Sequence, residues 1–407
     1  MEKIVFSYEK NNHSADRKNC LLILPRPIFP LISGYSNKNY NLIDGLSKQY
    51  NLTLIILISQ NLCAEEIAFY EKRVCNVSCF LITKREKYIG SIKSLFSRKP
   101  LQVGYYYRKE IANQITQQSD NMDIAIAALV RTIKYLDDIS SGCKKVFDMV
   151  DSIGLNYINS LHETSSVFWR LLYMIEGRRL LKYEKEKVKT SDCTFFISEK
   201  ERKYYQQYGK TVWLPHGVKE SLFIYDKFDA SYSKSIAFIG KMDYQPNIDA
   251  VKWYVKNVHS RIADQVPFII IGANPTEEIL DLGKKYPNIT ITGYCEDPYI
   301  YLYSAMAVVA PMLTGGGIQN KVLEGMALGK INILTSLAAE PITGAEDKKH
   351  YLVANTAEDY CSVIKNIVSN QDEYKDIGIE ARKFIQNNFT WRAYNNSYIS
   401  ALEEMKK

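Results

Sequence analysis

Residues 307–330 read AVVAPMLTGGGIQNKVLEGMALGK: a short apolar run, three consecutive glycines, and then a segment with helical spacing. A short apolar run of this kind is typical of a buried parallel strand. Strand, glycine turn and helix in this order predict that the turn lies at the carboxyl end of a parallel sheet. Open α/β sheets bind their ligands at that edge.

The glycine turn has the features of an anion site. A helix start offers unpaired backbone N–H groups and a positive dipole end, and glycines let the backbone approach a diphosphate closely. Lys321 and Glu324 are three residues apart and share a helix face, so the lysine can reach a phosphate and the carboxylate can bind a ribose diol. The spacing matches neither the P-loop nor Gly-x-Gly-x-x-Gly. The alternative is a plain turn followed by a surface ion pair of little energetic value.

Alternating strands and helices occur in two rounds along the 407 residues. The first begins with LLILP at 21–25, a helical pattern at 39–50 and a β-branched run at 51–59. The pattern restarts at 235–258 after a stretch without apolar periodicity. Two rounds predict an α/β protein with two doubly wound, Rossmann-like domains. Residues 1–19 are polar and are interpreted as an arm, and residues 110–140 have a helical pattern.

The composition limits the possible partners. The formal charge of +7 is a mild surplus that suits nucleotide diphosphates or an anionic membrane surface. Nucleic acid is not expected, because no dense basic run accompanies a known binding motif. No apolar stretch is long enough for a transmembrane helix, and the start lacks the apolar core of a signal peptide. Eight scattered cysteines fit reduced thiols, so a cytoplasmic location is expected.

The segment 311–330 resembles the donor-binding signature of retaining glycosyltransferases of the GT-B fold, in particular the family 4 type. FIGKMDYQPNIDAVKWY at 238–254 is similar to the opening of the same donor domain, and LPHGV at 214–218 to the crossing between domains. NNFTWRAYNNSY at 387–398 resembles the segment where the last helix returns to the first domain. The resemblance implies two domains that face each other across a cleft. Residues 1–212 would form the acceptor domain, 213–386 the donor domain and 387–407 the returning helix.

The resemblance also implies an activity. A hexosyltransferase would move a sugar from a nucleotide-diphosphate donor to a glycan or lipid-linked acceptor, with retention, in surface polysaccharide synthesis such as capsule or O-antigen. No cofactor other than the donor is implied. No metal is implied either, because the chain lacks an Asp-x-Asp triplet and the helix start with its lysines can take over the metal's role.

In this view Glu324 holds the ribose and the glycine amides hold the diphosphate, while Lys321 and Lys241 add positive charge. Many members of the family have a second glutamate where this chain has Gly316, so that carboxylate cannot be assumed for sugar binding. The expected donor-binding residues are Gly34, His216, Gly240, Lys241, Gly315, Gly316, Gly317, Ile318, Lys321 and Glu324.

Three residues are candidates for the acceptor side. Asp148 and Asp151 come at the end of a predicted strand in VFDMVDS and can orient an acceptor hydroxyl, the alternative being a solvated loop or a helix cap. His162 can touch the donor sugar, although a lone histidine is more often structural. Glu184 is interpreted as part of a solvated helix face, and Trp169 as a core residue.

Residues 92–110 combine cations with three tyrosines at 105–107. This composition suits a peripheral membrane contact, and the alternative is a solvated loop followed by a tyrosine-rich strand. Two other functions remain open for the whole chain. A nucleotide-sugar 2-epimerase shares the fold but needs more acid/base residues, and a non-catalytic subunit would bind the donor without transferring it.

Overall fold

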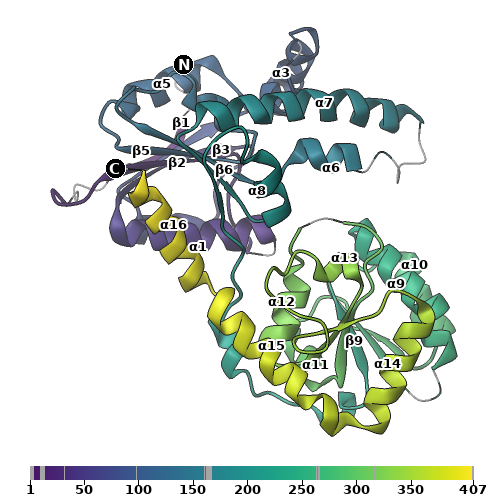
Figure 1. Ribbon diagram of the computed structural model, residues 1–407. Coiled ribbons are helices and arrows are strands. Elements are labelled where there is room, and N and C mark those ends of the chain that lie inside the picture. Colours follow the sequence, from purple (N-terminus) through teal and green to yellow (C-terminus); the bar gives the residue numbers. More distant parts are fainter. Residues whose placement is uncertain are drawn as a thin grey trace. The chain divides into compact units, whose positions relative to one another are not determined.

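The computed structural model describes residues 4–9, 14–31, 33–97, 99–159, 161, 167–262, 264, 266–315 and 317–405. The chain divides into two compact α/β units (Figure 1). The first unit comprises residues 1–215 and 395–407, and the second comprises residues 216–394. The chain therefore passes into the second unit once and returns within its last helix, α16 (Trp391–Glu404).

The first unit is built on an eight-stranded sheet in the order β1-β4-β3-β2-β5-β6-β7-β8. Strands β2 to β8 are parallel, and β1 runs antiparallel to β4 at the edge. The inner strands are apolar runs buried on both faces, as expected where helices cover both sides of a parallel sheet. The strands are β1 (Ile4–Glu9), β2 (Asn19–Leu24), β3 (Asn51–Ile58), β4 (Asn76–Leu81), β5 (Ile124–Ala128), β6 (Lys144–Val150), β7 (Cys193–Phe196) and β8 (Thr211–Trp213).

The helices of the first unit follow its strands in alternation. The longest, α7, is a single helix over the segment that the sequence pattern predicted, but it exposes Leu171 and Ile175 and buries Glu184. The helices are α1 (Gly34–Gln49), α2 (Ala64–Arg73), α3 (Lys84–Phe96), α4 (Leu101–Tyr106), α5 (Lys109–Ser119), α6 (Ile153–Asn159), α7 (Val167–Thr190) and α8 (Glu199–Tyr205), with a short 3-10 helix at Ile133–Leu136.

The second unit has a six-stranded, fully parallel sheet in the order β11-β10-β9-β12-β13-β14. Its strands are β9 (Ile236–Ile239), β10 (Phe268–Ile271), β11 (Ile289–Ile291), β12 (Ala307–Ala310), β13 (Ile331–Leu334) and β14 (Leu352–Val353). Its helices are α9 (Gln245–Asn257), α10 (Glu277–Lys285), α11 (Tyr299–Ser304), α12 (Asn320–Ala327), α13 (Ser336–Ala339), α14 (Ala357–Ser369) and α15 (Lys375–Asn388). The two doubly wound α/β sheets confirm the predicted fold class.

Four local expectations were wrong. Residues 4–9 are not part of a polar arm, because they form strand β1 and pair with β4. The segment 110–140 is not helical throughout, because IAIAA at 124–128 is the buried strand β5 between β2 and β6. Its alanines favour a helix locally, but tertiary pairing overrides that weak preference. Tyr105 and Tyr106 end a helix instead of forming a strand, and Trp169 is exposed on α7 instead of lying in the core.

Candidate active site

The second unit has a topological switch point between β9 and β12. From β9 the chain proceeds outward to β10 and β11, and then returns to the other side of β9 as β12, β13 and β14. The ladder between β9 and β12 pairs only their amino-terminal halves, Ile236 with Ala307 and Ala237 with Val308. Ligands of open α/β sheets bind outside the carboxyl ends of the strands at such a point. The loops at 240–244 and 311–319 leave the sheet there.

The glycine loop has a backbone that only glycine adopts readily. Gly315 has φ of 102° and Gly317 has φ of 75°, both in the left-handed region. Ile318 is buried and anchors the end of the loop, and α12 begins two residues later. The N-cap residue Gln319 makes no side-chain capping bond to the first turn of α12. Gly316 lies outside the described residues.

Lys321 lies on the first turn of α12 and is largely enclosed. Its Nζ donates to Oδ1 of Asn247, lies 3.4 Å from Sδ of Met312 and sits 4.7 Å from the centre of the Phe238 ring. Burial without a carboxylate partner lowers the pKa of Lys321 to about 7. A phosphate placed beside this amine would favour its charged form.

Asn247 connects the two loops of the switch point. Its Nδ2 donates to the carbonyl oxygen of Lys241 at 2.8 Å, while its Oδ1 accepts from Lys321. The amide packs so closely that a Cβ on Gly240 would lie 2.6 Å from Nδ2, which explains the glycine at that position. The side chain of Lys241 is half-exposed, with its Nζ 3.6 Å from the carboxylate of Asp243. Asn247 was not among the residues expected at the site, although it follows Pro246 at the start of α9.

Glu324 lies one turn after Lys321 but has different partners. Its carboxylate accepts a hydrogen bond from the hydroxyl of Tyr299 on α11. Burial raises the pKa of Glu324 to about 7, and the nearby charge of Lys219 opposes that shift. Lys321 donates its hydrogen bond to Asn247, so Lys321 and Glu324 do not form the surface ion pair that their spacing allowed. The sequence carried no signal for Tyr299, which is one of 30 tyrosines.

His216 lies at the first residue of the second unit and is buried. Its ring is 5.8 Å from that of Trp391, at an angle of 40°. Val218 pairs with the segment between α15 and α16, because its N donates to Phe389 O at 2.8 Å. The ring of His216 therefore contacts the first residue of the last helix.

Asp148 lies inside β6 and is held in a buried ion pair. Its Oδ2 accepts from Nζ of Lys38 on α1 and, at 3.2 Å, from the hydroxyl of Tyr398 on α16. Burial lowers the pKa of Lys38, while the charge of Asp148 opposes that shift. Only 2% of Asp148 is exposed, so in this structure its carboxylate joins three elements of the first unit. Gly34 begins α1 after β2, with Ser33 as a capping residue whose Oγ accepts from Ser36 N at 3.2 Å.

Asp151 follows the carboxyl end of β6 and belongs to a group of buried carboxylates. Burial raises its pKa to about 6, and burial together with the charge of Asp151 raises the pKa of Glu201 to about 8. Glu184 was expected on a solvated face, but it is fully buried. It accepts from Ser152 Oγ at 2.7 Å, from the Tyr205 hydroxyl at 2.6 Å and from Gly154 N at 3.1 Å. The i, i+4 pattern of α7 could not reveal this, because the partners come from the turn after β6, from α6 and from α8.

His162 lies outside the described residues. Within the part of the chain that the structure describes, no group of three or more His, Cys, Asp or Glu residues is arranged to hold a metal ion. No described helix is long and apolar enough to span a bilayer.

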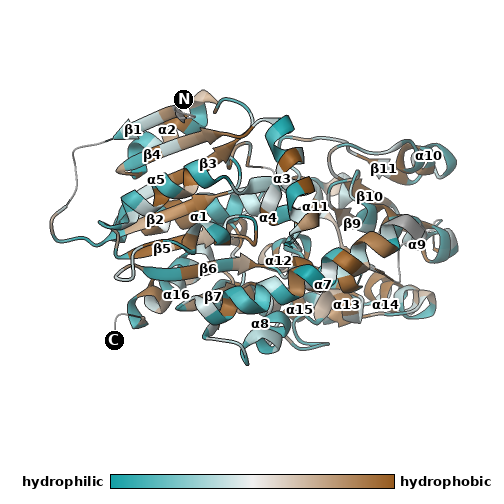
Figure 2. Ribbon diagram, turned by 90° about the horizontal axis from the view of Figure 1, so that it is seen from above, coloured by the Kyte–Doolittle hydropathy of each residue, from teal (hydrophilic) through white to brown (hydrophobic). Residues whose placement is uncertain are grey.

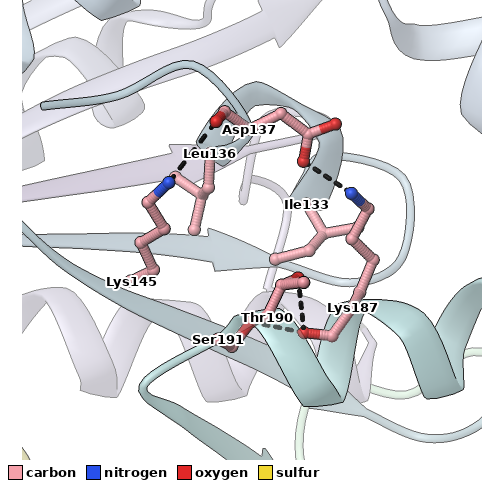
Figure 3. A pocket seen from close by; sticks show the side chains of 7 residues that line it. All are labelled: Ile133, Leu136, Asp137, Lys145, Lys187, Thr190 and Ser191. Carbon is pink, nitrogen blue, oxygen red and sulfur yellow. Dashed lines mark hydrogen bonds and ion pairs between the residues drawn. The ribbon is translucent and has the colours of Figure 1, made fainter. Parts of the chain in front are cut away.

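A pocket of about 310 Å³ lies elsewhere in the first unit (Figure 3). Asp137 accepts from Nζ of Lys187 at 2.6 Å through its carboxylate, and from Nζ of Lys145 at 3.4 Å through its backbone carbonyl. Lys145 is the second residue of β6 and Ser191 precedes β7, so this pocket opens at the amino ends of the strands. It lies at the opposite edge of that sheet from the ligand-binding ends.

Comparison with protein families identifies the domain around the glycine loop. Residues 233–370 match the family described as Glycosyl transferases group 1. The match lies within the second unit, residues 216–394. The matched segment includes β9, the glycine loop and α12, and covers about a third of the chain.

One curated relative comes from Klebsiella pneumoniae and is described as an uncharacterized 44.6 kDa protein in cps region. It is 28% identical over 240 residues. The match covers 56% of this chain and 60% of the relative, so it spans less than two thirds of that protein.

Solved structures share the fold over almost the full length. Sucrose-phosphate synthase from Thermosynechococcus elongatus has a TM-score of 0.64 at 13% identity, with 95% of this chain and 99% of that chain covered. HepE from Anabaena in complex with UDP has a TM-score of 0.64 at 12% identity, with 95% and 100% covered. A variant of TarM from S. aureus has a TM-score of 0.64 at 11% identity, with 94% and 99% covered. The fold is GT-B, as predicted.

Proposed function

We propose that this protein is a glycosyltransferase that moves a sugar from a nucleoside-diphosphate donor to a glycan or lipid-linked acceptor. One observation carries the proposal: the glycine loop and α12 lie at the switch point of a group 1 domain, with Lys321 and Glu324 on adjacent turns. The structural neighbours support the donor class, since HepE was solved with UDP and with UDP-glucose. The location of the Klebsiella relative in a cps region supports a role in surface polysaccharide synthesis on the cytoplasmic side, where nucleotide sugars are made.

Each proposed role follows from an observed environment. The amides of the glycine loop and of the first turn of α12 would bind the diphosphate. Lys321 would contribute charge to the leaving phosphate, with Lys241 nearby on the other loop. Glu324, oriented by Tyr299, would accept hydrogen bonds from the ribose hydroxyls. The loop between β2 and α1 that ends at Gly34 in the first unit and the acceptor-side carboxylate of Asp151 are also proposed to take part.

The proposed chemistry is charge stabilisation and positioning. As the bond from the sugar to the diphosphate breaks, negative charge develops on the leaving phosphate, and fixed amide dipoles and lysines stabilise it. We propose that transfer retains the configuration and proceeds without a metal ion, because these groups already supply positive charge at the diphosphate. Activity should then survive EDTA, and a complete loss that is restored by magnesium or manganese would contradict metal independence.

Nucleotide binding tests the site directly. Calorimetric titration with UDP, GDP, CDP and ADP should identify one preferred base. Glu324→Gln should then weaken binding of that nucleotide by about 10- to 100-fold, the effect of losing hydrogen bonds to a charged group. Glu373→Gln, at an exposed site in the same unit, is the matched control and should bind normally. Equal affinities for both variants would refute the ribose assignment.

Turnover distinguishes the proposed transferase from the alternatives. A transferase releases nucleoside diphosphate faster when acceptor is added. An epimerase converts the nucleotide sugar without acceptor, and a non-catalytic subunit binds the nucleotide sugar without releasing diphosphate. Either of these two outcomes would replace the proposal.

A further inference from the structure

Helix α3 packs against its neighbour through small residues. A Cβ on Gly90 would collide with the backbone oxygen of Gly104 on α4, and a Cβ on Gly104 would collide with Ser94. The buried residues of α3 are Lys87 and Ser94, and Lys87 donates to Ser59 Oγ at the end of β3. The inward face of α3 is therefore made of glycine, serine and one lysine.

The outward face of α3 carries the large apolar side chains. Phe96 is 83% exposed and Tyr88 is 64% exposed, and Ile89, Ile92 and Leu95 are exposed as well. At about 3.6 residues per turn these five residues form one stripe opposite the inward face. An ordinary surface helix buries such a stripe, so α3 is inverted. Figure 2 shows the alternation of brown and teal along α3, and Figure 1 places this helix at the periphery of the first unit.

The charge around this stripe is mostly positive. Residues 84–109 contain eight lysines and arginines and one carboxylate, a formal charge of +7 that equals the charge of the whole chain. The remaining residues are therefore balanced. The one carboxylate, Glu86, accepts hydrogen bonds from the amide and hydroxyl of Thr83, both at 2.9 Å, as part of a capping box. Lys84 and Lys93 are exposed and lie on the two sides of the stripe.

The tyrosine run does not form the outer surface. Tyr107 packs 5.3 Å from the ring of Tyr135, under the amine of Lys134 at 3.8 Å, and Tyr106 is also half-buried against the core. The membrane contact that was expected at residues 92–110 is therefore assigned to the stripe on α3 instead of the tyrosine run.

We infer that the outward stripe of α3, Tyr88, Ile89, Ile92, Leu95 and Phe96, docks onto a lipid bilayer rich in anionic headgroups. Apolar side chains flanked by lysines lie at the boundary of headgroups and acyl chains, and cations near an anionic surface add to that affinity. A second copy of this chain is the wrong partner, because pairing α3 with itself would bring the exposed Lys84 and Lys93 of one copy toward those of the other. The inference concerns the first unit alone and does not depend on the nucleotide site.

Co-sedimentation of the full chain with vesicles tests the inference. The protein should bind vesicles of phosphatidylcholine with about a third phosphatidylglycerol, and binding should decrease as salt increases. Vesicles of phosphatidylcholine alone should bind at least about tenfold less, since each cation near an anionic surface contributes about fivefold. Equal binding to both vesicles, or no binding to either, would overturn the inference.

Variants locate the contact. Ile92→Ser combined with Phe96→Ser should reduce partitioning at least about tenfold. Lys84→Gln combined with Lys93→Gln should reduce it about 25-fold in low salt, at about fivefold for each cation, and less in high salt. Phe228→Ser is the matched control, because Phe228 is 57% exposed in the second unit, and it should bind as the parent does.

Melting temperatures and nucleotide affinity should be unchanged in all three variants. If the parent protein fails to bind nucleotide, the vesicle-binding result can therefore still be interpreted. A concentration-dependent dimer that the Ile92→Ser and Phe96→Ser pair abolishes would show that the stripe binds a second copy, and would overturn the inference.

Discussion

Asn247 joins Lys321 to the backbone of Lys241, so one buried amide connects the two loops of the switch point. The arrangement supports Lys321 with a neutral oxygen instead of a carboxylate. The amine is therefore held in position while its charge is left uncompensated. An anion that enters the site supplies the missing negative charge.

The affinity for a nucleoside diphosphate should depend on pH in two directions. The pKa of Lys321 is lowered to about 7, so this lysine loses its proton as the pH rises above 7. The pKa of Glu324 is raised to about 7, so this carboxylate gains a proton as the pH falls below 7. The binding form, with both groups charged, is most populated near pH 7, and affinity should fall several-fold toward pH 9 and toward pH 5.5. Titration calorimetry across this range measures the profile.

Single substitutions assign the two limbs of that profile. Lys321→Met should remove the alkaline limb and Glu324→Gln the acid limb. An alkaline decrease that persists in Lys321→Met would show that another group controls it.

The left-handed glycines should be needed for binding. Alanine at Gly315 or Gly317 would carry about 1–2 kcal/mol of backbone strain, because their φ values are 102° and 75°. Relief of that strain requires the loop to move, and nucleotide affinity should fall at least about tenfold. Gly293→Ala is the matched control, since Gly293 also has a positive φ, of 63°, with open space around its Cβ position. This control should be destabilised to a similar degree in thermal melting but should bind nucleotide normally.

The ion pair of Lys38 with Asp148 should stabilise the fold. Asp148→Asn leaves the buried Lys38 without its charged partner, and the free energy of unfolding should fall by about 3–5 kcal/mol. The double variant Lys38→Met with Asp148→Leu should recover much of that loss, because neither buried charge remains. Tyr398→Phe should cost about 1 kcal/mol. Urea unfolding followed by circular dichroism measures each value. Normal stability of Asp148→Asn with lost sugar transfer would instead support the acceptor-binding role that the sequence suggested.

The stability of the first unit should fall as the pH rises. Folded Asp151 and Glu201 have pKa values of about 6 and about 8, and burial also raises the pKa of Glu184. These acids titrate near pH 4 when unfolded, so between about pH 4 and 8 the folded state binds more protons. Their stabilising contribution is complete at about pH 4 and is lost as the pH rises through these values.

Glu201→Gln should flatten this dependence by up to about 5 kcal/mol, because the pKa of Glu201 rises from 4.5 to about 8 and each pKa unit is worth about 1.4 kcal/mol. Glu71→Gln, at an exposed position on α2, should leave the dependence unchanged. Chemical unfolding at a series of pH values distinguishes the two variants. An increase of stability with pH in the parent would contradict the proposed protonation.

Much of the architecture could be predicted from local patterns. The runs at 51–59 and 307–310 are strands, and the long amphipathic segment from residue 167 is one helix, because apolar periodicity and turn residues act over short distances. The alanine-rich strand β5 could not be predicted in this way. Its residues favour a helix, and its pairing with β2 and β6 depends on segments far away in the chain.

The sequence by itself determined that a glycine turn precedes a helix carrying Lys321 and Glu324, because backbone freedom and helical spacing are local properties. Only the tertiary structure decided which groups surround them. Asn247, Tyr299 and Lys219 come from other parts of the second unit. Burial moves both pKa values toward 7, while Lys219 and Tyr299 oppose the shift of Glu324. Burial also decided that Glu184 is enclosed and that the apolar stripe of α3 is exposed, because solvent exposure depends on what packs against a helix and not on its own periodicity.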